Sequence, residues 1–151
     1  LEFGTSLGIS TMYMAASCPG ATVITMEGCT RTSEIAAENF NEAGLNNIRL
    51  INGSFDDTLP VLKSEKVCPG LVFIDGNHRK EPVIRYFNQV ADMSGTESVV
   101  IIDDINSSPG MAEAWSEIRN HRNVTLSLDI FRMGIVFFRK GLNQINYVVR
   151  Y

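Results

Sequence analysis

The sequence predicts an α/β fold in which a doubly wound, mostly parallel sheet carries helices on both faces. Short apolar runs of strand length alternate along the chain with amphipathic helical patterns, which is typical of successive strand–helix units. Towards the C-terminus two strand patterns follow each other without a helix between them, which indicates an antiparallel pair. The length of 151 residues suits one domain, and we expect a single domain over residues 1–151.

Five apolar runs are the predicted parallel strands. They need not alternate in polarity, because a strand between two helical layers is buried on both faces. The runs cover residues 1–3, 21–27, 48–52, 71–75 and 99–103.

Amphipathic stripes predict helices after four of these strands. Gly44 is placed to end the second helix, and Pro82 suits the first turn of the third. Ser108 is the expected cap of the fourth helix, and Pro109 its first residue. The stripes consist of Ile9, Met12, Tyr13 and Ala16; of Ala36, Phe40 and Ala43; of Val83, Phe87, Val90 and Ala91; and of Met111, Ala114, Trp115 and Ile118.

The C-terminal part predicts the antiparallel pair. Residues 124–130 alternate strictly between apolar and polar side chains, and residues 134–138 form a second strand pattern after a short link. In the tail, residues 142–151, the segment 147–149 is suited to one more edge strand.

Composition and charge exclude several classes of protein. Thirteen basic and seventeen acidic residues give a net charge of −4, which argues against a nucleic-acid partner. No apolar run approaches the roughly 18–20 residues of a membrane span, so no membrane partner is expected. Cys18, Cys29 and Cys68 cannot all pair within one chain, which favours the reducing cytoplasm. The chain begins at Leu1 rather than at Met, and we expect that its natural N-terminal segment is missing.

Candidate site residues follow the predicted strands, because ligands bind at the carboxyl ends of the strands in such a sheet. After the first strand, Gly4 and Gly8 allow a tight turn, and the following helix offers free N–H groups to an anionic ligand. A plain strand–helix turn explains the same glycines. Glu27 lies 19 residues beyond Gly8, close to the spacing at which an acidic side chain binds ribose hydroxyls. The alternative is a solvated glutamate at the end of a strand.

Residues after the third strand are suited to a nucleobase. Ser54 and Phe55 are placed to hold and cover an adenine ring. Asp56 and Asp57 have a simpler interpretation as caps of the short helix that follows.

Acidic residues after the last two parallel strands predict a magnesium site. Asp75, Asp103 and Asp104 should meet at one edge of the sheet, and carboxylate oxygens are suited to Mg²⁺. His78 lies close enough in sequence to exchange a proton there near neutral pH. Aspartates at strand ends also form turns and caps, so the structural interpretation stays open. His121 lies in a polar helix end and is expected to be a surface residue.

Taken together, these motifs resemble a class I S-adenosylmethionine-dependent methyltransferase. The opening Glu-x-Gly-Thr-Ser-x-Gly-x-Ser is similar to the first motif of the small-molecule O-methyltransferases of the catechol and caffeoyl-CoA type. Its combination with Glu27, with Phe-Ile-Asp-Gly-Asn-His and with Ile-Ile-Asp-Asp is more specific than the opening alone. The resemblance covers the chain from Glu2 to about Lys140, and it implies a Rossmann-like sheet that ends in an antiparallel strand pair.

The resemblance implies a role for each matching residue. The residues around the methionine part of the cofactor would be Glu2, Gly4, Thr5, Ser6 and Gly8. Glu27, followed by Gly28, would bind the ribose, Ser54 and Phe55 would contact the adenine, and Asp75 would complete the cofactor site. Asp75, Asp103 and Asp104 would be the metal ligands, with Asp75 and His78 as the catalytic residues.

The sequence departs from the family pattern at two site positions. Asp104 stands where the family usually has Asn, and His78 stands where catechol-type enzymes have a catalytic lysine. Family members also carry helices before the first strand, and these are missing here.

The expected function is methyl transfer from S-adenosylmethionine to an oxygen of a small-molecule acceptor, with Mg²⁺ as the expected assisting ion. The loop Phe131-Arg132-Met133 either lines the acceptor pocket or is an ordinary hairpin connection. One alternative is a nicotinamide-dependent oxidoreductase, although the close Gly-x-Gly-x-x-Gly pattern of that class is absent from the opening. Another alternative is a non-catalytic cofactor-binding domain. If the chain forms an oligomer, we expect a homodimer.

Overall fold

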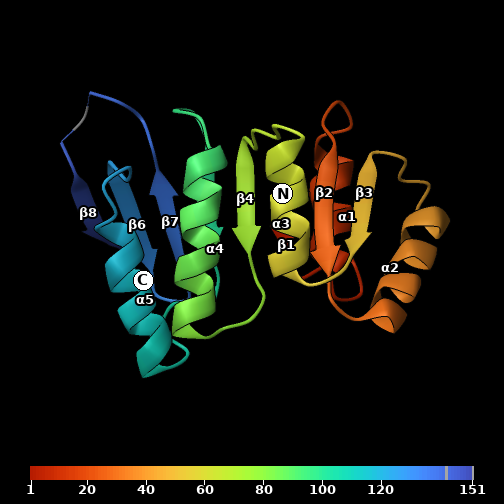
Figure 1. Ribbon diagram of the computed structural model, residues 1–151, viewed down its shortest axis with the longest axis horizontal. Coiled ribbons are helices and arrows are strands. Elements are labelled where there is room, and N and C mark those ends of the chain that lie inside the picture. The colour runs from red at the N-terminus through yellow and green to blue at the C-terminus, as the bar shows by residue number, and fades with distance from the viewer. Residues whose placement is uncertain (142, 151) are drawn as a thin grey trace. The chain divides into compact units, whose positions relative to one another are not determined.

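The computed structural model describes residues 1–141 and 143–150, and the chain forms two compact units, Leu1–Glu65 and Lys66–Tyr151. Figure 1 colours the first unit from red to yellow and the second from green to blue. Leu142 and Tyr151, which belong to the tail considered above, lie outside the described residues.

The first unit contains three parallel strands in the order β3-β2-β1. In Figure 1, α3 lies in front of these strands and α1 behind them, so helices cover both faces as predicted. The elements of this unit are β1 Glu2–Phe3, α1 Ile9–Ser17, β2 Val23–Glu27, α2 Thr30–Glu42, β3 Ile48–Asn52 and α3 Phe55–Ser64.

The helix ending that Gly44 predicts in the first unit is confirmed. After α2, Gly44 adopts φ +67°, and its N–H donates to the carbonyl of Asn41. The N–H of Leu45 donates to the carbonyl of Phe40, which completes a Schellman ending. The core contains Phe3 and Met26, both fully buried, and the buried Phe40 of α2 packs against Gly8, where there is no room for a Cβ.

The second unit contains five strands in the order β4-β5-β7-β6-β8. β4 and β5 are parallel, β7 is antiparallel to both β5 and β6, and β8 is parallel to β6. The predicted antiparallel pair and the predicted edge strand are therefore confirmed. The elements are β4 Leu71–Ile74, α4 Lys80–Met93, β5 Val99–Ile102, α5 Pro109–Arg119, β6 Leu126–Ile130, β7 Met133–Phe137 and β8 Ile145–Val148.

Helices α4 and α5 lie side by side on one face of the second sheet (Figure 1). The Ser108 hydroxyl accepts the N–H of Met111 at 3.2 Å, and Pro109 is the first helical residue, so the predicted start of α5 is confirmed. Trp115 of α5 packs against Gly134 of β7, where there is no room for a Cβ.

Three predicted details are wrong. The strands are shorter than the apolar runs, since β2 begins at Val23 and both β4 and β5 end before their aspartates. The cap of α3 is Ser54 rather than an aspartate. His121 is half-buried, because its ring packs edge-on against Phe87 with the centroids 5.4 Å apart.

None of the helices within residues 1–141 and 143–150 has the length and apolarity needed to cross a membrane.

Candidate active site

The turn between β1 and α1 uses backbone conformations that favour glycine. Gly4 and Gly8 have φ of 92° and 85°, and between them Ser6 has φ of 50°. A Cβ at Gly8 would also lie 2.3 Å from the ring of Phe40. Gly8 is the N-cap residue of α1 and has no side chain with which to cap the first N–H groups of that helix. Those groups are available to an anionic ligand.

Glu2 lies beneath this turn and is fully buried. Its carboxylate accepts hydrogen bonds from the hydroxyls of Ser10 and Thr11 in α1 and of Thr25 in β2. The Thr25 hydroxyl also lies 2.6 Å from that of Thr5. The carboxylate is thus enclosed by protein hydroxyls, and Glu2 ties α1 to β2 rather than facing a ligand.

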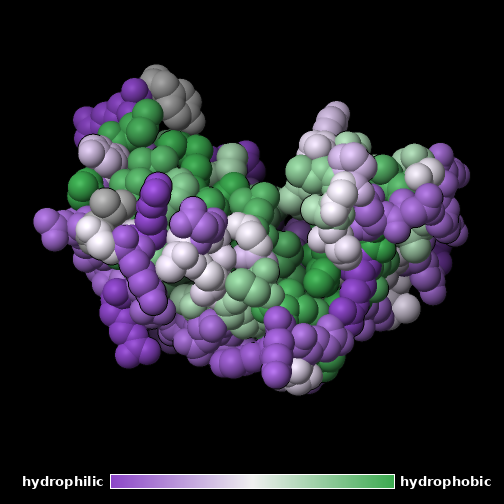
Figure 2. Space-filling model, turned by 90° about the horizontal axis from the view of Figure 1, so that it is seen from above, coloured by the Kyte–Doolittle hydropathy of each residue, from purple (hydrophilic) through white to green (hydrophobic). Residues whose placement is uncertain are grey.

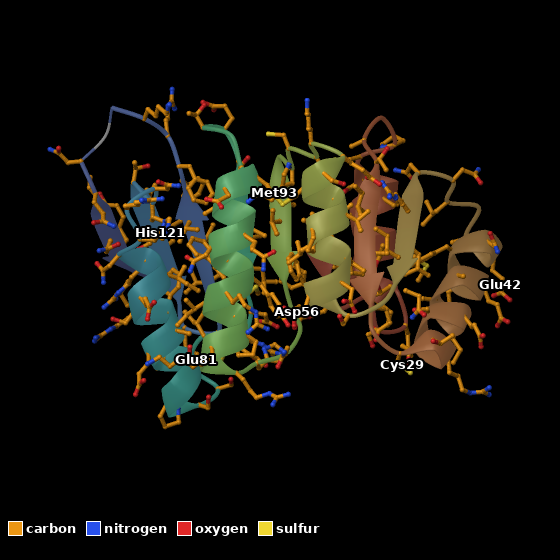
Figure 3. All side chains as sticks on the ribbon, viewed as in Figure 1. Cys29, Glu42, Asp56, Glu81, Met93 and His121 are labelled. Atoms are coloured by element: carbon orange, nitrogen blue, oxygen red, sulfur yellow. The ribbon has the colours of Figure 1, made fainter. Side chains whose placement is uncertain are left out.

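Glu27 joins the glycine turn to the start of α2. One carboxylate oxygen accepts the N–H of Ser6 at 2.9 Å, and the other accepts the N–H of Cys29 at 2.9 Å. Figure 3 shows Cys29 at the start of α2, next to the carboxyl end of β2. A Cβ at Gly28 would meet no atom within 4 Å, so space does not demand glycine there. The structure thus brings together Glu27 and the predicted turn residues of the first unit.

Ser54 and Phe55 lie at the carboxyl end of β3. The Ser54 hydroxyl accepts the N–H of Asp57 at 3.2 Å and donates to its Oδ2 at 2.6 Å, so it serves as the cap of α3. Phe55 is half-buried and packs edge-on against Phe3, with the ring centroids 5.2 Å apart.

In the second unit, Asp75 and Asp103 follow two neighbouring strands directly. Ile74, the last residue of β4, pairs with Ile102, the last residue of β5. The two aspartates that follow therefore leave the sheet side by side. The next residue, Asp104, has φ of 56°. Aspartate and asparagine adopt this left-handed conformation more readily than other residues with a Cβ.

His78 lies between two of these carboxylates. Its Nε2 is 3.5 Å from Oδ1 of Asp75, and its Nδ1 is 4.0 Å from Oδ2 of Asp104. Burial is the largest cause, and together with the nearby charges of Asp103 and Asp104 it raises the pKa of Asp75 to about 6, while His78 acts in the opposite direction. The cluster therefore concentrates negative charge.

Arg132 supplies positive charge to the other side of this cluster. Its Nε lies 3.5 Å from Oδ1 of Asp103 and 3.4 Å from Oδ1 of Asp104. The sequence left open whether the loop of Arg132 lines the acceptor pocket or is an ordinary hairpin connection, and it did not predict these ion pairs. No local pattern indicates them, because β7 returns to β5 from a distant part of the sequence.

We call the group formed by Asp75, Asp103, Asp104, His78 and Arg132 the aspartate cluster. Its carboxylates have the chemistry of a magnesium site, but their present arrangement does not match one. Within residues 1–141 and 143–150, no three His, Cys, Asp or Glu side chains are placed to hold one metal ion. Oδ1 of Asp103 is nevertheless buried and accepts no hydrogen bond from these residues. Such an oxygen among other carboxylates is a position that a cation would stabilise.

Comparisons with known proteins show the family to which the chain belongs. A family model described as "Methyltransferase domain" matches residues 1–105. Catechol O-methyltransferase of Niastella koreensis is 32% identical over 108 residues, which cover 70% of this chain and 48% of that protein. The O-methyltransferase imqG of Aspergillus flavus is 31% identical over 111 residues, covering 70% of this chain and 44% of that protein. The chain thus spans about half the length of these curated relatives.

A solved structure shows the same fold. The O-methyltransferase from Bacillus cereus in complex with SAH is 25% identical and superimposes with a TM-score of 0.76, covering 90% of this chain and 72% of that chain. The predicted α/β, Rossmann-like fold class is confirmed. Because the family model covers 105 of the 151 residues, the chain belongs to the family of methyltransferase domains.

Proposed function

We propose that the protein transfers a methyl group from S-adenosylmethionine to an oxygen of a small molecule. The observation that carries the proposal is the contact between the Glu27 carboxylate and the N–H of Ser6, in a chain of the methyltransferase domain family. This contact places a carboxylate that is suited to ribose hydroxyls beside a glycine turn that is suited to an anionic ligand. The family leaves the nicotinamide-dependent alternative without support.

Glu27 has the capacity to bind two ribose hydroxyls. An ionised carboxylate offers about four acceptor positions on its two oxygens. Each oxygen of Glu27 already accepts one backbone N–H, from Ser6 and from Cys29, and each retains a further lone pair. The two backbone bonds fix the carboxylate, so ribose binding costs little side-chain ordering.

The turn after β1 would hold the methionine part of the cofactor. The main chain of Gly4, Thr5, Ser6 and Gly8 would surround it, and the first N–H groups of α1 would face its carboxylate. Glu2 would support this turn from beneath, because its side chain holds α1 against β2.

The adenine would lie near the start of α3. Phe55 offers a half-buried ring for an apolar contact. The Ser54 hydroxyl already caps the helix, so its contact with the base would come from other atoms of the residue. Gly28 would allow close approach beside the ribose.

The acceptor chemistry would belong to the aspartate cluster. When bound, the cofactor supplies a sulfonium methyl group that undergoes in-line displacement, so the protein contributes position and electrostatics rather than a nucleophile. His78 would remove the proton of the acceptor hydroxyl. Asp75, Asp103 and Asp104 would hold Mg²⁺, which lowers the pKa of a coordinated hydroxyl.

The first test is calorimetric titration of S-adenosylhomocysteine into the full chain. We expect micromolar binding, and a loss of at least tenfold in Glu27→Ala. Glu42→Ala is the matched control, because Glu42 lies at the other end of α2 from Cys29 (Figure 3). Absence of binding to the folded chain, or equal binding by the two variants, would contradict the assignment of the cofactor site. Binding without turnover on phenols and acids would favour the non-catalytic cofactor-binding domain.

We also propose a homodimer and a cytoplasmic location. Within the described residues, β8 pairs with β6 and leaves its other edge open, with Ile145, Tyr147 and Val148 exposed. Figure 2, coloured by residue hydropathy, shows hydrophobic residues at the surface among hydrophilic ones. A second copy pairing at this edge would cover these side chains, and light scattering would give the mass. The cytoplasmic proposal is supported by the thiols of Cys18, Cys29 and Cys68, which are free and exposed, as suits a reducing compartment.

A further inference from the structure

The side chain of Arg132 lies against two carboxylates of the aspartate cluster with ion-pair rather than hydrogen-bond geometry. Its Nε is 3.5 Å from Asp103 and 3.4 Å from Asp104, and Oδ1 of Asp103 still accepts no hydrogen bond from the described residues. The Asp103 side chain is only 10% exposed, whereas that of Arg132 is 68% exposed. A nearly buried carboxylate is therefore neutralised by a largely solvated cation.

The backbone beneath Arg132 is held firmly. The N–H of Ile105 donates to the carbonyl of Arg132 at 3.0 Å, and the side chain of Asn106 donates to the carbonyl of Phe131 at 2.6 Å. Both donors come from the segment that directly follows Asp103 and Asp104. The β6–β7 turn is thus fixed beside the aspartates, and only the guanidinium is free to change position.

The surroundings give the guanidinium room to move. A pocket of about 410 Å³ is lined by Asp104, Asn106, Ser107, Phe131 and Arg132. The side chain can leave the carboxylates and enter this pocket while the turn stays in place.

We propose that Arg132 is a built-in competitor of the divalent cation. In the absence of metal its guanidinium neutralises Asp103 and Asp104, and a metal ion that binds these carboxylates displaces it into the pocket. This inference rests on the metal site of the proposed function. It explains why the carboxylates converge although, among the residues that the structure describes, no three ligand side chains are placed to hold one ion.

Competition predicts that removal of the guanidinium tightens metal binding. We would titrate Mn²⁺, as a paramagnetic substitute for Mg²⁺, into the full chain and measure free Mn²⁺ by electron paramagnetic resonance. Loss of the two ion pairs of this largely exposed guanidinium should strengthen binding roughly tenfold in Arg132→Ala. Arg132→Gln, which keeps the length of the side chain and removes its charge, should change the affinity in the same direction.

Arg139→Ala is the matched control. It removes the same charge, but Arg139 follows the far end of β7, whereas Arg132 directly precedes the strand. We expect its Mn²⁺ affinity to stay within about twofold of the wild type, because exposed charges that far apart are largely screened. Asp103→Asn should abolish binding, with circular dichroism confirming the fold.

Other results would overturn the inference. Unchanged or weaker Mn²⁺ binding by both Arg132 variants contradicts competition, and equal tightening by Arg139→Ala reduces the effect to net charge. Absence of Mn²⁺ binding in every variant removes both the competition and the metal site. The titration with S-adenosylhomocysteine reports separately on the cofactor site, so failure of the methyltransferase assignment is recognised independently.

Discussion

The ring of Trp115 covers Gly134 so closely that a Cβ at this position would lie 2.5 Å from a ring carbon. The indole N–H donates to Oδ2 of Asp129 at 3.0 Å, which fixes the ring over the strand. β7 is paired on both sides, with β5 and β6, so the backbone at Gly134 has little freedom to move away. Helix α5 is therefore held to the sheet through a position that requires glycine.

We predict that Gly134→Ala lowers the free energy of unfolding by about 1–3 kcal/mol, as is typical of overpacking. Urea denaturation measures the loss. Gly70→Ala is the control, because a Cβ there meets no atom within 4 Å, and it should change stability by less than about 0.5 kcal/mol. Equal stability of the two variants would show that the indole moves aside easily.

We predict that Glu2→Gln destabilises the protein by about 1–3 kcal/mol, because three hydroxyl donors lose a charged acceptor in a buried site. Thermal and urea denaturation measure the change. Glu34→Gln, on the exposed side of α2, is the matched control and should leave stability within about 0.5 kcal/mol. A stable Glu2→Gln protein would indicate that the hydroxyls reorient around a neutral amide.

His121 makes stability depend on pH. Burial lowers its pKa below the ordinary 6.5, Arg122 adds to this effect, and Asp92 opposes it. The N–H of Asn123 also donates to Nδ1 of His121, so this nitrogen must be unprotonated in the folded chain. The unfolded chain therefore takes up a proton more readily than the folded one.

The stabilisation from neutral His121 is complete above pH 6.5 and is lost as the pH falls below that value towards the folded pKa. We predict that Tm declines between pH 7.5 and pH 5.5 and that His121→Asn makes this decline shallower. Parallel curves for the wild type and the variant would mean that other groups cause the pH dependence.

We predict that Asp75→Ala reduces methyl transfer by at least a hundredfold and leaves affinity for S-adenosylhomocysteine largely intact. The reason is that Asp75 lies among the carboxylates that would hold the acceptor, next to His78. Methyl transfer to a panel of phenols measures turnover, and calorimetry measures cofactor binding. Turnover equal to that of the wild type would exclude a metal-binding role for Asp75.

Much of the fold follows from local patterns in the sequence. The ends of α2 and α5 are correct because Gly44 and Ser108 act through contacts within a few residues. The strand ends were placed one residue too far at Asp75 and Asp103, since an apolar run does not show where pairing stops.

The side-chain contacts of the site could not be predicted in the same way. Glu2 meets Thr25 and Arg132 meets Asp103 across many residues of sequence, and such contacts depend on how strands pair. Glu27 was identified because its distance from Gly8 is fixed by one strand–helix–strand unit, whereas no comparable spacing connects Arg132 to the aspartates.

The left-handed backbone of Asp104 also limits how this position can change during evolution. Branched side chains are strained there, whereas Asp, Asn and Gly are tolerated. Codons for Asp and Asn differ by a single base, so one mutation exchanges a charged residue for a neutral one with no cost to the backbone. The charge beside Arg132 can therefore change in a single step while the loop keeps its shape.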